Sequence, residues 1–226
     1  MVFRVAVTTT LDRTAGMSAE LVAVGLTPVE LPCIEVVRGR EEDIVRARAA
    51  CEEADLIVLA SSRPLDALWP DGSFPEVDAA VIGPATATSV VERGGTVRLV
   101  GDGSLLSLVR SLRVECSRVA IPHAPSTDPQ ALAELADRCG DLVAVPVYST
   151  APIGPADDEE VDGVVFVSSS AVHGWALTRS FDWLSIACLG PSTSAMLQLY
   201  GRDSDVVDRH RSYRDLAVGL ASLVTT

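Results

Sequence analysis

The sequence predicts an α/β fold made of two related three-layer domains, each built on a parallel sheet. Short runs rich in Val and Ile alternate with Ala- and Leu-rich helical stretches along the 226 residues. This alternation is typical of parallel α/β sheets. Two sets of residues also recur at constant spacing, and the 48% apolar content is sufficient for two domain cores.

Each predicted strand is a short apolar run, and most of these runs are rich in Val and Ile. The predicted strands cover residues 4–8, 29–36, 56–60, 79–82, 97–100, 119–122, 143–149, 163–167, 185–189 and 205–207. Three of the predicted helices begin at a Pro, which is favourable in the first turn. The predicted helices cover residues 15–24, 41–53, 84–93, 105–112, 129–138, 171–178, 191–200 and 213–223.

An internal repeat divides the chain into two related halves. One set of residues recurs 107 positions later: Asp55, Val58, Ser61, Ser62, Gly83, Pro84, Thr86 and Gly94 recur as Asp162, Val165, Ser168, Ser169, Gly190, Pro191, Thr193 and Gly201. A second set recurs 114 positions later: Val5, Ala6, Leu21 and Pro32 recur as Val119, Ala120, Leu135 and Pro146. The likeness therefore extends over long segments.

Two predicted strands, in "VELPCIEVV" and "VAVPVYSTAP", contain a Pro near the middle. Pro cannot donate a ladder hydrogen bond, so such strands belong at a sheet edge or in a bridging ladder. We expect these strands to connect the two domains.

The charge balance excludes several kinds of partner. Asp and Glu total 31, whereas all 18 basic residues are Arg, which leaves a net charge of −13. Nucleic-acid backbones and anionic membranes are therefore disfavoured as partners, although an anionic small molecule is compatible with a locally positive site. No apolar stretch approaches the roughly 20 residues of a membrane span, and the N-terminus lacks signal-peptide features. We expect a cytoplasmic protein.

Several common sites are not indicated. The five Cys residues are far apart and lack metal-site spacing, so we expect reduced thiols, mostly buried. His123, His173 and His210 are not clustered, and no Gly-x-Ser-x-Gly elbow is present. The segment "GDGSLL" lacks the third Gly of a dinucleotide fingerprint.

Hydroxyl residues follow four predicted strands. In "IGPAT" and "LGPST" the Thr is expected to satisfy a free amide at a helix N-terminus, and these N-termini could also hold ligand carboxylates. Paired Ser residues in "LASSRP" and "FVSSSAV" precede further helices. Because α/β proteins bind ligands at the carboxyl ends of their strands, these turns predict a polar rim and a cleft between domains.

Tyr148, in "VPVYST", has two interpretations. The phenol is either a buried aromatic group of a connecting strand or a cleft-facing acid or hydrogen-bond donor. The residue itself does not decide between them.

Taken together, "VPVYST", the paired strand–Ser–helix units, "IGPAT", "LGPST" and the closing helix resemble the uroporphyrinogen-III synthase family over essentially the whole chain. The resemblance implies a cofactor-independent, metal-free enzyme that closes the linear tetrapyrrole hydroxymethylbilane into uroporphyrinogen III, with loss of water and inversion of the last ring. It also implies crossed, discontinuous domains, 1–33 plus 151–226 and 37–142, joined by linker strands 31–36 and 143–150. We expect a monomer.

The resemblance also implies particular site residues. Tyr148 matches a tyrosine proposed to assist departure of the hydroxyl group, and Ser168, Ser192 and Thr193 match hydroxyl groups of the cleft. On the facing domain, Ser61 aligns with the Ser of the family's Thr-Ser turn. The candidate substrate-binding residues are Thr8, Ser61, Ser62, Arg63, Thr86, His123, Ser168, Ser169, Ser192 and Thr193. Ala60 replaces a family Thr, and the loops at "VTTTL" and "IPHAPSTDPQAL" lack the arginines found there in many members.

These departures leave two alternatives to the enzyme. One is a catalytically impaired tetrapyrrole-binding or regulatory homologue with the same fold. The other is a two-domain binding protein for a different anionic metabolite. Titration with uroporphyrinogen and measurement of turnover would separate the three.

Overall fold

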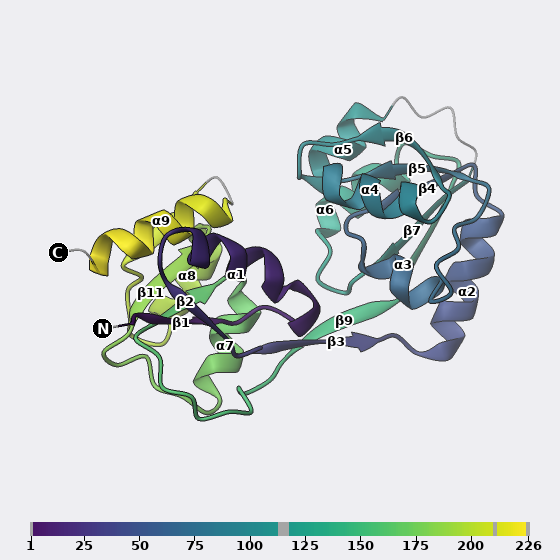
Figure 1. Ribbon diagram of the computed structural model, residues 1–226. Coiled ribbons are helices and arrows are strands. Elements are labelled where there is room, and N and C mark those ends of the chain that lie inside the picture. The colour runs from purple at the N-terminus through teal and green to yellow at the C-terminus, as the bar shows by residue number, and fades with distance from the viewer. Residues whose placement is uncertain (1, 113–117, 210–211, 225–226) are drawn as a thin grey trace. The chain divides into compact units, whose positions relative to one another are not determined.

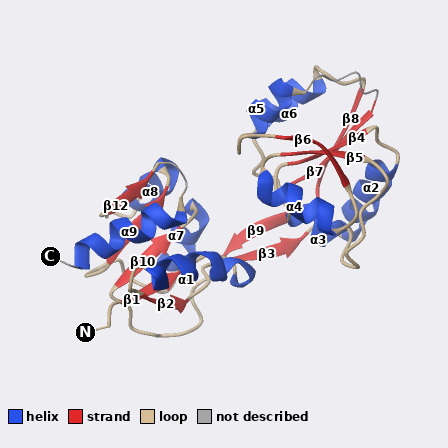
Figure 2. Ribbon diagram, turned by 45° about the horizontal axis from the view of Figure 1, so that its top comes forward, coloured by secondary structure: helices blue, strands red, loops and turns tan. Residues whose placement is uncertain are grey.

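The computed structural model describes every residue except 1, 113–117, 210–211 and 225–226. The chain forms two compact units (Figure 1). The terminal unit comprises Met1–Val36 and Thr150–Thr226, and the central unit comprises Val37–Ser149. Within each unit, helices flank a sheet of parallel strands (Figure 2), which confirms the predicted three-layer α/β class.

The central unit contains a five-stranded sheet in the order β6-β5-β4-β7-β8. Its strands are β4 (Leu56–Leu59), β5 (Asp78–Val81), β6 (Thr96–Val100), β7 (Arg118–His123) and β8 (Asp141–Pro146). Helices α2 (Glu41–Glu52), α3 (Arg63–Leu68) and α4 (Pro84–Glu92) pack on one face, and α5 (Leu105–Ser111) and α6 (Pro129–Ala136) on the other. Side chains of β4 point alternately to the two faces of the sheet. Ile57 and Leu59 contact the first helical layer, and Leu56 and Val58 contact the second.

The terminal unit has the corresponding sheet in the order β12-β11-β10-β1-β2. Its strands are β1 (Arg4–Val7), β2 (Thr27–Glu30), β10 (Gly163–Phe166), β11 (Ser185–Leu189) and β12 (Val206–Asp208). Helices α7 (Ser169–Ala176) and α8 (Pro191–Gln198) pack on one face, and α1 (Thr14–Ala23), preceded by the 3-10 turn η1 (Leu11–Arg13), packs with α9 (Tyr213–Val224) on the other.

The two sheet orders are the same once the sequence repeat is applied. The 107-residue spacing relates β4, β5 and β6 to β10, β11 and β12, and the 114-residue spacing relates β1 and β2 to β7 and β8. The repeated residues Asp55 and Asp162 have the same structural role in the two units. The Asp55 carboxylate accepts a bond from the Arg118 backbone N–H at 2.8 Å, and the Asp162 carboxylate accepts the same bond from Arg4 at 2.8 Å. The repeated Asp therefore aligns the two central strands of each sheet.

Two strand predictions were wrong in extent. The predicted strand 29–36 is two strands, β2 and β3 (Ile34–Arg38), and the predicted strand 143–149 is divided between β8 and β9 (Tyr148–Pro152). Each division falls at or beside a Pro, which cannot donate a ladder hydrogen bond. The positional expectation is confirmed, since β2 and β8 are edge strands and β3 pairs with β9 in a separate two-stranded sheet. The predicted helices also omitted α3, whose six residues are too few for periodicity to detect.

No disulfide joins the described cysteines, and Cys33, Cys51 and Cys188 are buried. Burial raises the pKa of each of these three thiols to about 12, so they stay protonated at neutral pH and are poor nucleophiles. Cys139 is partly exposed, and Cys116 lies outside the described residues. Among the described helices, none is long and apolar enough to cross a membrane.

Replacement of Gly174 by Ala should destabilise the terminal unit. A Cβ on this residue of α7 would lie 2.0 Å from the Cys33 carbonyl oxygen and 2.7 Å from the Ile153 carbonyl oxygen, and backbone cannot move aside cheaply. We expect Gly174→Ala to lower the free energy of unfolding in urea by about 2 kcal/mol or more.

Gly16 in α1 provides the matched control. A Cβ there meets only the Tyr213 side chain at 3.7 Å, an ordinary contact, and Ala is the better helix former. Gly16→Ala should be neutral or slightly stabilising. Equal urea midpoints for the two variants would contradict the close approach of α7 to residues 33 and 153.

Candidate active site

The candidate residues of the terminal unit lie along one edge of its sheet. Since β1, β10 and β11 pair in parallel, their carboxyl ends lie side by side. Thr8 follows β1, the pair Ser168 and Ser169 follows β10, and the pair Ser192 and Thr193 follows β11. The structure thus brings these five residues of distant sequence position to the same edge.

Two of the hydroxyl groups at this edge serve the fold. The Thr8 hydroxyl is buried and donates to the Val165 carbonyl at 2.7 Å. The Thr193 side chain, only 2% exposed, donates to the Leu189 carbonyl at 3.1 Å. Thr193 was expected to satisfy a free amide at the N-terminus of α8, but its hydroxyl bonds this strand carbonyl instead. At α8 the Thr hydroxyl instead ties the turn to the end of β11.

The serines of the terminal unit have different roles. Ser168 caps α7, since its side chain accepts a bond from the Ala171 N–H at 3.3 Å, as capping chemistry predicts. The Ser169 hydroxyl donates to the Ser192 carbonyl at 3.1 Å and so joins the turns that precede α7 and α8. Ser192 itself is exposed, in the first turn of α8. Of the five candidate residues at this edge, Ser192 is therefore the most exposed.

The candidate residues of the central unit also lie at strand ends. Ser61, Ser62 and Arg63 follow β4 and are partly exposed, whereas Thr86 in α4 is buried. His123 ends β7, and its Nδ1 lies 2.7 Å from the Ala124 carbonyl. Arg63 is thus the candidate cation at this edge.

Tyr148 is the first residue of β9 and lies 2.9 Å, oxygen to oxygen, from the Ser61 hydroxyl. Its ring is partly buried and packs against the apolar cluster that includes Val145 and Val147. Both residues are candidates from sequence, but no sequence pattern pairs them. The ring therefore packs on apolar side chains while its oxygen meets a polar partner, as is usual for a partly buried Tyr.

The twin Gly-Pro turns differ in backbone conformation. Gly190 has φ +92°, in the region that favours glycine, whereas Gly83 has φ −175°, an extended conformation open to any residue. Similar sequences thus begin α8 and α4 with different turn geometry.

Another arginine of the central unit serves structure instead. Arg93 lies at the C-terminal end of α4, and its guanidinium contacts the Asp66 carboxylate at 2.5 Å and the Ser89 carbonyl at 3.2 Å. It is therefore at the opposite end of α4 from the carboxyl edge of the sheet.

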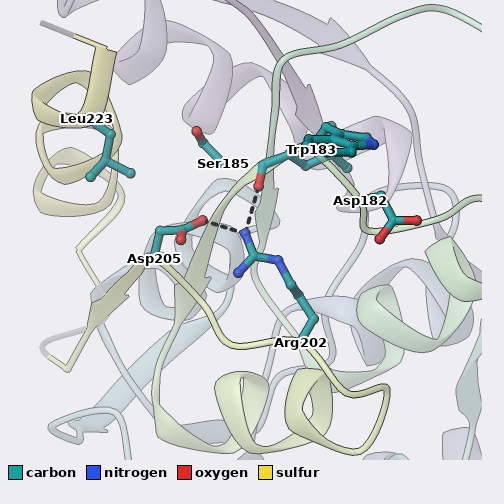
Figure 3. Close-up of a pocket in the computed structure, with 7 residues that line it drawn as sticks. Asp182, Trp183, Ser185, Arg202, Asp205 and Leu223 are labelled. Atoms are coloured by element: carbon teal, nitrogen blue, oxygen red, sulfur yellow. Dashed lines mark hydrogen bonds and ion pairs between the residues drawn. The ribbon is translucent and has the colours of Figure 1, made fainter. Parts of the chain in front are cut away.

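A pocket of about 500 Å³ lies at the other edge of the terminal sheet, where Ser185 begins β11 (Figure 3). Arg202 in this pocket already bonds the Asp205 carboxylate at 3.2 Å and the Leu184 carbonyl at 3.0 Å. None of the candidate residues lines it. The pocket lies at the opposite edge of the sheet from the candidate residues, and its Arg202 already bonds other groups of the protein. The pocket is therefore distinct from the candidate site.

The fold and these turns define a two-unit parallel α/β protein with polar groups at the carboxyl edges of both sheets, a typical ligand-binding arrangement. The family model described as Uroporphyrinogen-III synthase HemD matches residues 15–218. The chain belongs to the uroporphyrinogen-III synthase family.

Solved structures share the fold. Uroporphyrinogen-III synthetase from Helicobacter pylori 26695 superposes with a TM-score of 0.65 at 12% identity, covering 99% of this chain and 100% of that one. A mutant uroporphyrinogen III synthase from the extremely thermophilic bacterium Thermus thermophilus gives a TM-score of 0.59 at 20% identity, covering 99% of both chains. A search of curated protein sequences gave no significant match.

The twin glycines should respond differently to replacement by Ala. Gly190→Ala forces a side chain into a positive-φ conformation and should lower the free energy of unfolding by about 1–3 kcal/mol. Gly83→Ala should change it by less than about 0.5 kcal/mol, because a Cβ there meets no atom within 4 Å. A Cβ on Gly190 also meets nothing within 4 Å, so urea unfolding of the pair isolates the backbone effect. Two equally stable variants would refute the difference between the turns.

Proposed function

We propose that this chain closes hydroxymethylbilane to uroporphyrinogen III, with inversion of the last ring and release of water, in tetrapyrrole biosynthesis. Family membership over residues 15–218 supports this activity. The structural observation that supports this activity most directly is at Tyr148. Its phenol oxygen lies 2.9 Å from the Ser61 hydroxyl oxygen, and the residue is partly exposed. We further propose that the protein acts as a cytoplasmic monomer without a cofactor or metal. The net charge of −13 supports a role without nucleic acid.

The chemistry demands little from catalytic side chains. The C–O bond of the hydroxymethyl group breaks as Tyr148 donates a proton to the departing hydroxyl group, so that water departs and a cationic azafulvenium remains beside the phenolate. The substituted carbon of the last ring then attacks the methylene carbon of that cation and gives a spiro intermediate. The bond from this ring carbon to its original bridging methylene breaks, and that methylene bonds to the free α-carbon of the same ring, which inverts the ring. The proton lost when the macrocycle regains its pyrroles restores the phenol. General acid help of about 10²–10⁴-fold is typical for such a group.

Selection of the isomer is a geometric task. Unaided closure gives the uninverted product, so the protein must hold the chain ends in the geometry that favours attack at the substituted carbon. Anchoring of the acetate and propionate side chains supplies that constraint.

Main-chain N–H groups are suited to that anchoring in an acidic protein. Helices α8, α7 and α4 begin at the carboxyl edges of their sheets, where unpaired N–H groups and the positive ends of helix dipoles favour anions. Ser192 in α8 is exposed, whereas the Thr193 hydroxyl is committed to Leu189. We propose that main chain provides most of the anchoring, with Ser62, Ser169, Ser192, Arg63 and His123 as side-chain contributors.

Isomer analysis tests the activity. Hydroxymethylbilane is generated in situ by a deaminase, the protein is added, and the oxidised products are separated into type I and type III porphyrins. We expect predominantly type III, with kcat reduced about 100-fold or more in Tyr148→Phe because the proton donor is lost. Type I alone, at the unaided rate, would reject the activity and favour a catalytically impaired tetrapyrrole-binding homologue.

Main-chain anchoring is tested by product affinity. The double variant Ser192→Ala, Thr193→Ala should bind uroporphyrinogen III, measured by equilibrium dialysis under nitrogen, within about three-fold of the wild type, because no N–H group is removed. Ser192→Glu should weaken binding by more than about ten-fold, since its carboxylate competes for the same helix N-terminus. Complete loss of binding in the double alanine variant would instead assign the affinity to side-chain hydroxyls.

A further inference from the structure

We infer that Ser61 is a positioning residue, whose hydroxyl donates a hydrogen bond to the Tyr148 phenol oxygen and leaves the phenol proton available to the departing hydroxyl group. The two oxygens are 2.9 Å apart, and the residues are 87 positions apart in the chain. This inference rests on the proposed function. It gives Ser61 a role in orienting the acid, distinct from the substrate contact expected from sequence.

The internal repeat shows why the Ser61 hydroxyl is available. Its counterpart in the terminal unit, Ser168, uses its side-chain oxygen to accept from the N–H three residues later, at Ala171. The residue three positions after Ser61 is Pro64, which has no N–H. Ser61 therefore cannot form that cap, and α3 has no side-chain cap from its N-cap residue Ser62.

The remaining partners of Ser61 favour one direction of donation. The Arg63 backbone N–H approaches the Ser61 side-chain oxygen at 3.4 Å, so one lone pair of that oxygen already faces a donor. A Ser hydroxyl has one proton and two lone pairs. When Ser61 donates that proton to the phenol oxygen, its hydroxyl accepts from Arg63 and donates to Tyr148. The phenol O–H then remains available as a donor. Such a bond also stabilises the negative charge that forms as Tyr148 gives up its proton.

The ring of Tyr148 is held on its apolar side as well. It packs against the core cluster of the central unit, while its oxygen meets Ser61 at the end of β4. The corresponding residue 114 positions earlier is Ile34, which has no hydroxyl. The Ser and Tyr pair is thus specific to one unit, although the backbone positions are duplicated in both.

Steady-state kinetics with type III product as the readout test the role. Ser61→Ala should lower kcat about ten-fold and change KM by less than about two-fold, because the phenol loses its fixed orientation while substrate anchoring is intact. Ser61→Thr, which keeps the hydroxyl, should recover most of the rate. Ser89→Ala is the matched control: this hydroxyl bonds the Ala85 carbonyl of its own helix, and its removal should leave kcat unchanged.

A spectroscopic readout tests the hydrogen bond independently of turnover. The protein has three Tyr residues, so 3-fluorotyrosine labelling gives three ¹⁹F resonances, and Tyr148→Phe identifies the one that belongs to Tyr148. Ser61→Ala should shift that resonance, and Ser61→Thr should return it toward the wild-type position. Thermal unfolding of each variant confirms that the fold is retained.

The outcomes separate this inference from the proposed function. An unmoved resonance in Ser61→Ala overturns the inference even if the wild type makes type III product. A raised KM with unchanged kcat assigns Ser61 to substrate binding instead, and a raised kcat means that the phenol donates to Ser61; either result also overturns it. Type I product alone from the wild type rejects the proposed function, and the catalytic role of Ser61 with it, whatever the resonance does.

Discussion

The pairing of strands from distant parts of the chain is the constraint on which the rest of this structure depends. In the terminal unit β1 pairs with β10, more than 150 residues later in sequence, and reciprocal bonds between Arg4 and Asp162 set their register: the Asp162 carboxylate accepts from the Arg4 N–H, and the Arg4 carbonyl accepts from the Asp162 N–H, each at 2.8 Å. Parallel pairing then places all the carboxyl ends at one edge, so every polar turn of the unit depends on this register.

The polar groups gathered at these edges are divided between folding and chemistry. A buried hydroxyl requires a partner, and the nearest acceptor is the carbonyl at the end of a strand. Thr8 and Thr193 follow this rule and are internal ties. Ser192 is exposed, and the oxygen of the partly buried Tyr148 meets the Ser61 hydroxyl instead of a strand carbonyl. A polar strand end in the sequence is therefore not by itself a ligand-binding group.

Duplication has preserved backbone positions while their local chemistry has diverged. Ser168 caps a helix, whereas Ser61 at the equivalent position precedes Pro64 and contacts a phenol. Gly190 needs a glycine backbone, whereas Gly83 does not. Because fold stability depends on packing that both units share, such individual positions are open to specialisation without loss of the architecture.

The sequence by itself determined most helices and strands and the relation between the two units. Periodicity located most strands and helices, the 107- and 114-residue spacings corresponded to identical sheet orders, and the Pro-bearing segments lay at edges and in the separate ladder as expected. These features are local or repetitive, and local burial patterns report them directly.

The tertiary structure decided how individual side chains are used. Only folding showed that predicted strands 29–36 and 143–149 each divide, that Thr193 bonds a strand carbonyl instead of capping a helix, and that Ser61 meets Tyr148. The physical reason is that a hydroxyl group bonds whichever acceptor or donor the packed chain brings within about 3 Å. That neighbour can come from anywhere in the sequence, so no local pattern encodes it.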